Sequence, residues 1–392
     1  MRVPTFPLLL AFSLAPLLGG CDEVRDPAQP GPRRLAADAA ASASPSYEIV
    51  DLGTLGGDVS QATSLNDSDA VAGWSQTTEE FPPPSHAFLW THGSMQDLGT
   101  LGGCCSRADA VNLAGQVAGT STTASGEWHA FLWTAGQMQD LGPAFHDPGA
   151  FVYLNDAGEV AWTAGTLGAP GHAMRWSGGA AQDLGTLGGA ASLVRGINQA
   201  GAVAGHSDAP TRAHQDAFLW TPATGMLDLG NLGDQMATAG LNARGEVVGQ
   251  CIINPSSPSY RAWLWDGSQL VDLGSLSSLS AAGYGFRVNN RGQVLLRDAL
   301  WDRGTFTGPL GLSGVTLNQR GIVAGQVSIA RDVDHAAVWQ DGQVTDLGAP
   351  NTLSDPASSS PAAINAAADV AGWFGDGQFE GIRHAALWRR VQ

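Results

Sequence analysis

The segment WHAFLWTAGQMQDLG, residues 128–142, holds two short runs of strand length on either side of a Gly-containing turn. Residues 129–133 are rich in apolar and aromatic side chains, and residues 138–141 follow after a connection short enough for a hairpin. The segment therefore predicts two antiparallel strands joined by a tight turn.

The motifs of this hairpin return along the chain at a nearly constant spacing. Asp-Leu-Gly recurs every 43 to 46 residues, except for one step of 74 that a degenerate copy at residues 308–311 divides in half. A Trp recurs with it, and so does an Asn that mostly has Gly three residues later, so each motif has eight copies. The copies begin at Asp51, Asp97, Asp140, Asp183, Asp228, Asp272, Pro309 (in the degenerate copy) and Asp346; the other two sets are Trp90, Trp133, Trp176, Trp220, Trp265, Trp301, Trp339 and Trp388, and Asn66, Asn112, Asn155, Asn198, Asn242, Asn289, Asn318 and Asn365.

Each copy predicts four strands. The first ends at the Asn, the Asn-x-x-Gly turn leads to the second, and the third and fourth form the hairpin described above. Four short strands in about 44 residues is the length of a propeller blade. We therefore predict an all-β fold, a β-propeller of about eight four-stranded blades. Seven blades, with two units merged near residues 285–345, is the alternative.

The two ends of the repeat complement each other. The last copy stops at Trp388 without a fourth strand, whereas residues 47–52, YEIVDL, supply a spare fourth strand before the first copy. If the spare strand completes the last blade, the ring closes and no sheet edge is exposed. We predict that the N-terminal strand 47–52 pairs with the blade that contains Trp388.

The hairpin motif also resembles a known family. His-Ala-Phe-Leu-Trp at residues 86–90 and 129–133, and Asp-Leu-Gly-Thr-Leu-Gly-Gly at residues 97–103 and 183–189, are similar to the HAF-repeat family of probable extracellular bacterial proteins. The resemblance covers residues 47–392 and is weakest at residues 285–312. It implies export and a repeat fold, and it implies no activity and no catalytic residues.

The N-terminus predicts export. After Arg2, residues 6–18 form an apolar stretch too short to span a bilayer, and it ends at Leu-Gly-Gly-Cys21, which resembles a bacterial lipobox. The next segment is rich in Pro, Ala, Ser and charges, as in a flexible tether. We divide the chain into a lipoprotein signal peptide (1–20), a lipidated Cys21 with a disordered tether (21–46) and the HAF-repeat propeller (47–392). Lipidation places the protein in the bacterial cell envelope, in the inner or outer membrane; the alternative is plain secretion.

The charge of the chain excludes one class of partner. Its formal net charge is -17, and the 19 basic residues are all Arg. An acidic surface repels phosphate backbones, so we expect no nucleic-acid partner. No His or Cys pairs have zinc spacing, and we expect no metal, no cofactor, membrane contact through the lipid anchor only, and a monomer.

The remaining cysteines predict one local bridge. Cys104 and Cys105 are adjacent, whereas Cys251 lies three blades away, too far for the roughly 7 Å that a disulfide allows between Cα atoms. In an oxidising compartment Cys104 and Cys105 form either a vicinal disulfide or two free thiols.

The repeat also separates structural residues from candidate functional ones. Five histidines begin the third strand of their copies, and we interpret them as structural anchors because they recur: His86, His129, His172, His335 and His384. No residue is assigned a catalytic role. The loops between second and third strands vary most, so we predict that they bind a glycan or protein partner through Glu79, Glu80, Trp128, His214, Tyr260 and Arg261. The alternative is that these loops are merely solvated.

A propeller enzyme that acts on polysaccharide, a glycosidase or a lyase, is the alternative function. Such a site would use residues that break the repeat and converge on the central channel. The candidates are Arg107, Asp109, His146, Asp147, Arg195, Tyr284 and Arg287. A purely structural role in the envelope is a third possibility, and the sequence does not identify a ligand.

Overall fold

The computed structural model describes residues 45–79, 83–145, 151–165, 170–210, 215–233, 235–253, 260–276, 286–350, 357–375 and 382–391. The chain divides into two units, Met1–Ala43 and Ser44–Gln392, and every described residue belongs to the second. Among the described residues, no helix is long and apolar enough to cross a membrane.

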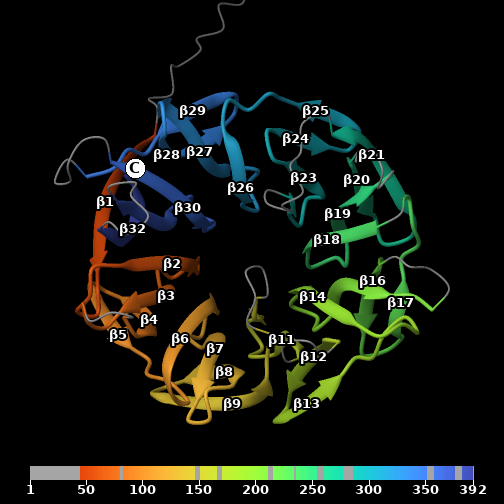
Figure 1. Ribbon diagram of the computed structural model, residues 1–392. Helices are drawn as coiled ribbons and strands as arrows, with labels where there is room; N and C mark the ends of the chain where they lie inside the picture. Colours follow the sequence, from red (N-terminus) through yellow and green to blue (C-terminus); the bar gives the residue numbers. More distant parts are fainter. Residues whose placement is uncertain are drawn as a thin grey trace, which may run out of the picture. The chain divides into compact units, whose positions relative to one another are not determined.

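The second unit is a ring of eight antiparallel sheets, each of four strands (Figure 1). We number the blades 1 to 8 in chain order. The strands of blades 1 to 4 are β2 (Ser60–Leu65), β3 (Val71–Gln76), β4 (Ser85–Thr91), β5 (Ser94–Asp97); β6 (Gly102–Val111), β7 (Val117–Thr123), β8 (Trp128–Thr134), β9 (Gln137–Pro143); β10 (Tyr153–Leu154), β11 (Val160–Ala164), β12 (His172–Ser177), β13 (Ala180–Asp183); and β14 (Ser192–Ile197), β15 (Val203–Asp208), β16 (Gln215–Thr221), β17 (Gly225–Asp228).

Blades 5 to 8 have the same strand order. Their strands are β18 (Gln235–Leu241), β19 (Val247–Ile252), β20 (Tyr260–Trp265), β21 (Leu270–Leu276); β22 (Phe286–Val288), β23 (Gln293–Leu296), β24 (Ala299–Asp302), β25 (Thr305–Thr307); β26 (Ser313–Leu317), β27 (Val323–Ala330), β28 (Val333–Gln340), β29 (Gln343–Asp346); and β30 (Ser358–Ile364), β31 (Val370–Gly375), β32 (Arg383–Val391), with β1 (Ser46–Gly53) as the fourth strand of blade 8.

The first and last strands of the chain close the ring. β1 pairs antiparallel with β32 from Ser46 opposite Val391 to Gly53 opposite Ala385. The eighth sheet therefore has the order β1-β32-β31-β30. Eight blades and closure by the N-terminal strand are confirmed, and the seven-blade alternative is wrong because residues 286–346 form two complete sheets.

The hydrophobic core lies between the blades. The cluster between blades 1 and 2, for example, joins Leu89 to Phe131 and Trp133. Eight such clusters are present in the described part of the chain, and each contains one of the eight repeated tryptophans. Burial of a Trp removes about 150–250 Å² from water, or roughly 4–6 kcal/mol as an upper estimate. The repeated Trp thus holds neighbouring blades together.

The repeated Asn joins the blades at the tight turns. Its Oδ1 accepts a hydrogen bond from the backbone N–H four residues later, at 2.9–3.0 Å in all eight turns. In seven turns its Nδ2 also donates to the carbonyl of the Asn in the next blade, at 2.8–3.1 Å. In the eighth, Asn365 donates instead to Oδ1 of Asp69, at 3.2 Å. The repeated Asn therefore shapes its own turn and also bonds to the turn of the next blade.

The repeated His anchors the third strand, as expected. Nδ1 of each of the five His residues lies 2.8–3.0 Å from the carboxylate of the Asp-Leu-Gly motif in the fourth strand of its blade. In blade 8 this bond joins His384 to Asp51 on β1, so it also contributes to closure. The bond to Asp51 raises the pKa of His384.

Candidate binding site in the central channel

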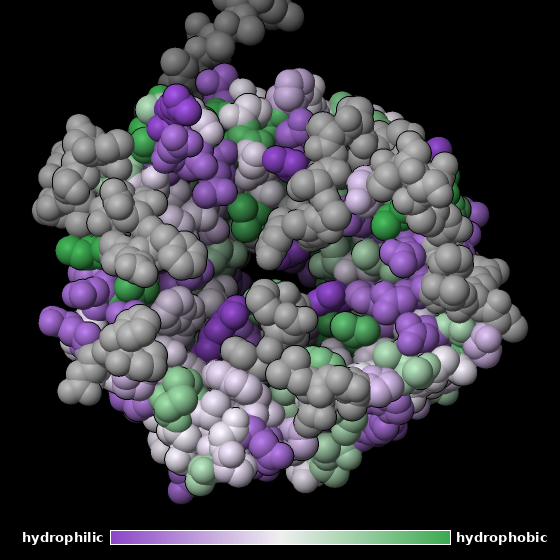
Figure 2. Space-filling view, viewed as in Figure 1, coloured by the Kyte–Doolittle hydropathy of each residue, from purple (hydrophilic) through white to green (hydrophobic). Residues whose placement is uncertain are grey.

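The first strand of every blade faces the centre of the ring, and together these strands form the wall of a central channel (Figure 1). Figure 2 shows a hollow at the centre of one face, with strongly hydrophilic side chains at its rim. Since consecutive strands are antiparallel, the loops between second and third strands open on one face, and the Asn turns lie on the other. A ligand that enters the channel therefore meets side chains of the first strands.

A glycine in the second strand controls the shape of this wall. In blade 4 a Cβ added to Gly205 would lie 1.8 Å from the carbonyl oxygen of Leu193 in the first strand. That close approach accompanies a β-bulge between Val194 and Gly196. Six blades share the glycine and the bulge.

Blades 3 and 6 lack both features. Trp162 and Leu296 occupy the position of the glycine, and the recorded pairing of their first strands shows no register shift. A side chain of that size cannot fit beneath the bulged carbonyl, so the first strand runs straight. Tyr153 and Arg287 lie on these two straight strands.

Asp109 and Arg195 are the extra residues of the bulges in blades 2 and 4. The equivalent residues of the other bulged strands are small or uncharged: Thr63, Ala239, Val315 and Ala362. The charged side chains of the described channel wall therefore come from the first strands of blades 2, 4 and 6.

The first part of the cluster is a buried ion pair. Nε of Arg107 lies 3.1 Å from Oδ1 of Asp109, whose side chain is only 2% exposed. The backbone N–H of Val152 in the next blade donates to Oδ2 of Asp109 at 3.1 Å, and the guanidinium of Arg107 lies 5.1 Å from the ring centre of Phe151. Burial outweighs these partners and raises the pKa of Asp109 to about 6.

The second part of the cluster centres on Tyr153. Arg195 donates a side-chain hydrogen bond to its hydroxyl, and the charges of Arg195 and Arg287 both act on it. Burial is the larger influence and raises the pKa of Tyr153, so the hydroxyl stays protonated at neutral pH. Burial likewise lowers the pKa of Arg287. Because Arg287 belongs to blade 6 and Tyr153 to blade 3, their interaction crosses the channel.

His206 borders the same cluster from the second strand of blade 4. Burial, with the nearby charge of Arg195, lowers its pKa to about 3, so the imidazole is neutral at physiological pH. The channel cluster, which we define as Arg107, Asp109, Tyr153, Arg195, His206 and Arg287, thus carries three guanidinium groups and one carboxylate. In a chain with a net charge of -17, it is a local excess of positive charge.

No group of three or more His, Cys, Asp or Glu side chains capable of holding a metal is present among the described residues. The arginines and the Tyr153 hydroxyl of the channel cluster offer hydrogen bonding and charge attraction toward an anion.

The described loop residues predicted to bind a partner are spread over blades 1, 2 and 5. Glu79 is exposed just after β3 of blade 1, whereas Trp128 and Tyr260 begin the third strands of blades 2 and 5 and are partly buried. Arg261 takes the place of the repeated His and donates from Nε to Oδ1 of Asp272 at 3.0 Å. Glu80 and His214 fall outside the described residues, and the binding roles of all six stay predictions.

The structure describes three of the four cysteines. The sulfurs of Cys104 and Cys105 are bonded to each other on β6, and the oxidation state of this pair in the cell stays a prediction. Cys251 is buried as a free thiol, and burial raises its pKa to about 11. Cys21 lies outside the described residues.

Of the repeat-breaking residues, the structure brings together Arg107, Asp109, Arg195 and Arg287. The others, His146, Asp147 and Tyr284, lie outside the described residues. Sequence reasoning missed Tyr153 and His206. The signal for Tyr153 was present in Trp162, since a bulky residue at a repeated Gly position marks a blade whose first strand is different.

Comparison with known proteins returns the fold alone. No family model and no curated protein matches the sequence. Among solved structures, the β-propeller domain of the Trilobed protease from Pyrococcus furiosus matches with 9% identity and a TM-score of 0.49, over 78% of this chain and 99% of that domain. That domain has an open velcro topology, whereas β1 closes the ring here.

Two further structures are similar at the same level. TolB from Acinetobacter baumannii matches with 12% identity and a TM-score of 0.40, over 71% of this chain and 63% of TolB. A gluconolactonase from Xanthomonas campestris, XC5397, matches with 13% identity and a TM-score of 0.36, over 88% of this chain and 90% of the enzyme. The eight four-stranded sheets and their closure by β1 define the class of this protein, an eight-bladed β-propeller.

Proposed function

We propose that this protein is an exported envelope lipoprotein of the HAF-repeat kind whose propeller is a binding module for a carboxylate-bearing glycan. Export and anchoring rest on the lipobox-like Cys21, and the HAF-repeat kind rests on the repeated hairpin motif. The protein acts as a monomer, contacts the membrane through its lipid alone and binds no nucleic acid.

One observation carries the choice of ligand. Three guanidinium groups and a protonated Tyr153 hydroxyl converge on the channel of a strongly acidic protein. Asp109 neutralises Arg107, and the charges of Arg195 and Arg287, which both act on the Tyr153 hydroxyl, favour an anion beside that hydroxyl. Arg binds carboxylates with paired hydrogen bonds, so a uronic acid suits the site. A glycan chain can bring one acidic sugar at a time into the channel.

The same cluster argues against the enzyme alternative. A glycosidase needs two carboxylates about 5–10 Å apart, and within the described residues the channel cluster has one, Asp109. A lyase needs a base, and the raised pKa of Tyr153 makes its hydroxyl a hydrogen-bond donor instead. We therefore favour binding over catalysis.

The proposal is tested by titrating the purified protein with an oligogalacturonate and with the same oligosaccharide after its carboxyl groups have been reduced to alcohols. We expect the acidic form to bind at least about tenfold more tightly, since charge-assisted hydrogen bonds contribute about 1.5–3 kcal/mol each. Equal binding of the two forms, or binding of neither, would contradict it. Release of unsaturated products from the acidic form would instead establish a lyase.

A further inference from the structure

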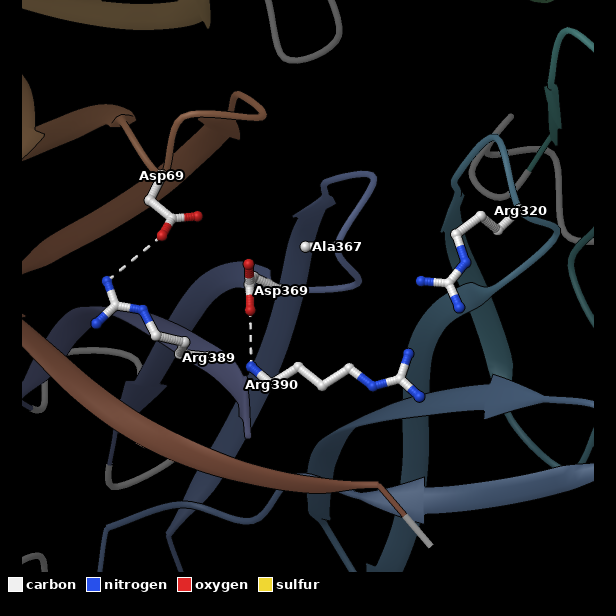
Figure 3. Close-up of a pocket in the computed structure, with 6 residues that line it drawn as sticks. All are labelled: Asp69, Arg320, Ala367, Asp369, Arg389 and Arg390. Carbon is white, nitrogen blue, oxygen red and sulfur yellow. Dashed lines mark hydrogen bonds and ion pairs between the residues drawn. The ribbon is translucent and has the colours of Figure 1, made fainter. Parts of the chain in front are cut away.

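A pocket of about 350 Å³ lies on the turn face, where the ring closes. Its lining comes from the Asn turns of blades 1, 7 and 8 and from the end of β32 (Figure 3). The lining residues are Asp69, Arg320, Ala367, Asp369, Arg389 and Arg390. The pocket therefore draws on three blades and on the last strand of the chain.

The two carboxylates of the pocket already have partners. Asp369 accepts from the backbone N–H of Arg390 at 2.7 Å and from Nδ2 of Asn365 at 3.0 Å. Asp69 accepts from Nδ2 of Asn365 at 3.2 Å, and its Oδ2 lies 3.7 Å from Nη2 of Arg389, too far for a hydrogen bond. Burial and the nearby Asp369 raise the pKa of Asp69. The carboxylates thus leave donors of the arginines unmatched.

Several donors around the pocket are buried without an acceptor among the described residues. They are Nη1 of Arg390, Nε of Arg389 and the hydroxyl of Tyr47 on β1. Tyr47 lies opposite Arg390 in the pairing of β1 with β32, and the charges of Arg390, Asp369 and Arg320 all influence its hydroxyl. A buried donor without an acceptor destabilises the fold, and more so when it is charged.

The guanidinium of Arg320 lies across the pocket from that of Arg390. In Figure 3 Arg320 and Arg390 point toward each other from opposite sides of the pocket, and no carboxylate stands between them. Within the described chain, no ion pair of the Arg320 guanidinium is recorded. Two like charges that face each other across a pocket repel, and an anion between them would remove that repulsion.

The equivalent arginine of blade 5 is different. Arg244 has the same place in its Asn turn as Arg320, and it is paired with Glu246 at 2.6 Å. Arg320 has Ile322 where Arg244 has Glu246. The Asn turn of blade 5 therefore does not reproduce the arrangement around Arg320.

We propose that this pocket binds a phosphoryl or similar oxyanion group between Arg320 and Arg390, with the Tyr47 hydroxyl as a further donor. The volume is ample for such a group, since a water takes about 30 Å³ in the liquid. Arg matches the geometry of phosphate oxygens with paired donors. The site is separate from the channel cluster and does not depend on the glycan proposal.

Binding at this place stabilises the closed ring. Tyr47 belongs to the first strand and Arg390 to the last, so the anion bridges the two ends of the ring. A ligand that binds only the folded protein raises its stability in proportion to the logarithm of its concentration. We expect inorganic phosphate at ten times its Kd to raise Tm by roughly 2 °C.

The test is isothermal titration of the purified protein with inorganic phosphate, at constant ionic strength set with chloride. Arg320→Ala and Arg390→Ala should each weaken phosphate binding by about tenfold or more, as expected for the loss of one charge-assisted contact. Tyr47→Phe, which keeps the ring in place and removes only the hydroxyl, should weaken it by a smaller factor. Arg244→Ala is the matched control and should bind phosphate as the wild type does.

The source of the phosphoryl group is decided by competition. Vesicles that contain phosphatidylglycerol will displace phosphate if a lipid headgroup is the natural ligand, and will not if the ligand is soluble; both results support the site. The inference is overturned if phosphate binds no better than chloride, or if Arg320→Ala and Arg390→Ala bind it as tightly as Arg244→Ala does. Because Arg287→Gln alters only the channel, its effect on glycan binding is independent of this result.

Discussion

The Asn turns and the channel wall are built from the same eight repeats, but they differ in how uniform they are. At the turns, all eight Asn side chains make the same local bond and seven of them make the same bond to the next blade. In the wall, equivalent positions hold Thr63, Asp109, Arg195 or Val315. Positions that repeat hold the ring together, and positions that differ between blades are where a ligand can be recognised.

The closing seam, where blade 8 meets blade 1, does not follow the uniform pattern of the other Asn turns. There the Asn365 side chain bonds to Asp69 instead of to a backbone carbonyl, and the neighbouring arginines form a pocket. The seam therefore has to supply stability through β1, which adds the pairing with β32 and the His384–Asp51 bond.

The largest effect is expected from removal of the closing strand. Deletion of residues 46–53 leaves β32 as an open edge and exposes the core cluster that contains Trp388. We expect loss of the single cooperative unfolding transition and a strong tendency to aggregate, measured by calorimetry and light scattering. Deletion of residues 22–44 is the control and should leave Tm unchanged. A ring that melts normally without β1 would contradict closure.

A smaller but still large effect is expected at the glycine that permits the bulge. In Gly205→Ala the new Cβ meets the carbonyl oxygen of Leu193 at 1.8 Å, so the two strands must separate. The free energy of unfolding should fall by roughly 2–4 kcal/mol, as for other overpacked cores. In Gly196→Ala, the matched control in the same blade, the nearest atom lies at 3.4 Å, and the change in denaturant midpoint should be small. Equal effects would refute the role given to the bulge.

A moderate effect is expected from the buried carboxylate of the channel. The pKa of Asp109 rises from 3.8 to about 6 on folding, so its contribution to stability is greatest below pH 4 and is lost as the pH rises to 6. Asp109→Asn has no carboxyl group to titrate at this position, so the variant does not lose this contribution to stability as the pH rises. The unfolding free energy of the variant minus that of the wild type should therefore increase by roughly 2–3 kcal/mol between pH 4 and pH 7. A difference that stays constant over this range would show that Asp109 titrates normally.

The sequence predicted the features that depend on repetition. Eight blades, the closing strand and the anchoring role of His86 and its equivalents all follow from spacing, because a blade that recurs must stack on copies of itself. The sequence did not predict that Asn112 and its equivalents bond across the seams, since that requires the distance between neighbouring turns. It also did not show that Arg195 and Arg287 both act on Tyr153, because these residues are far apart in the chain and only the closed ring brings them together.

The most direct test of the channel proposal is the Kd of an oligogalacturonate for Arg287→Gln and for Arg291→Gln. Both variants lose one positive charge from blade 6, but Arg287 lies in the channel wall and Arg291 in the Asn turn. The proposal predicts that Arg287→Gln weakens binding by about tenfold or more, while Arg291→Gln binds as the wild type does. Equal affinity of the two variants would contradict a binding site in the channel.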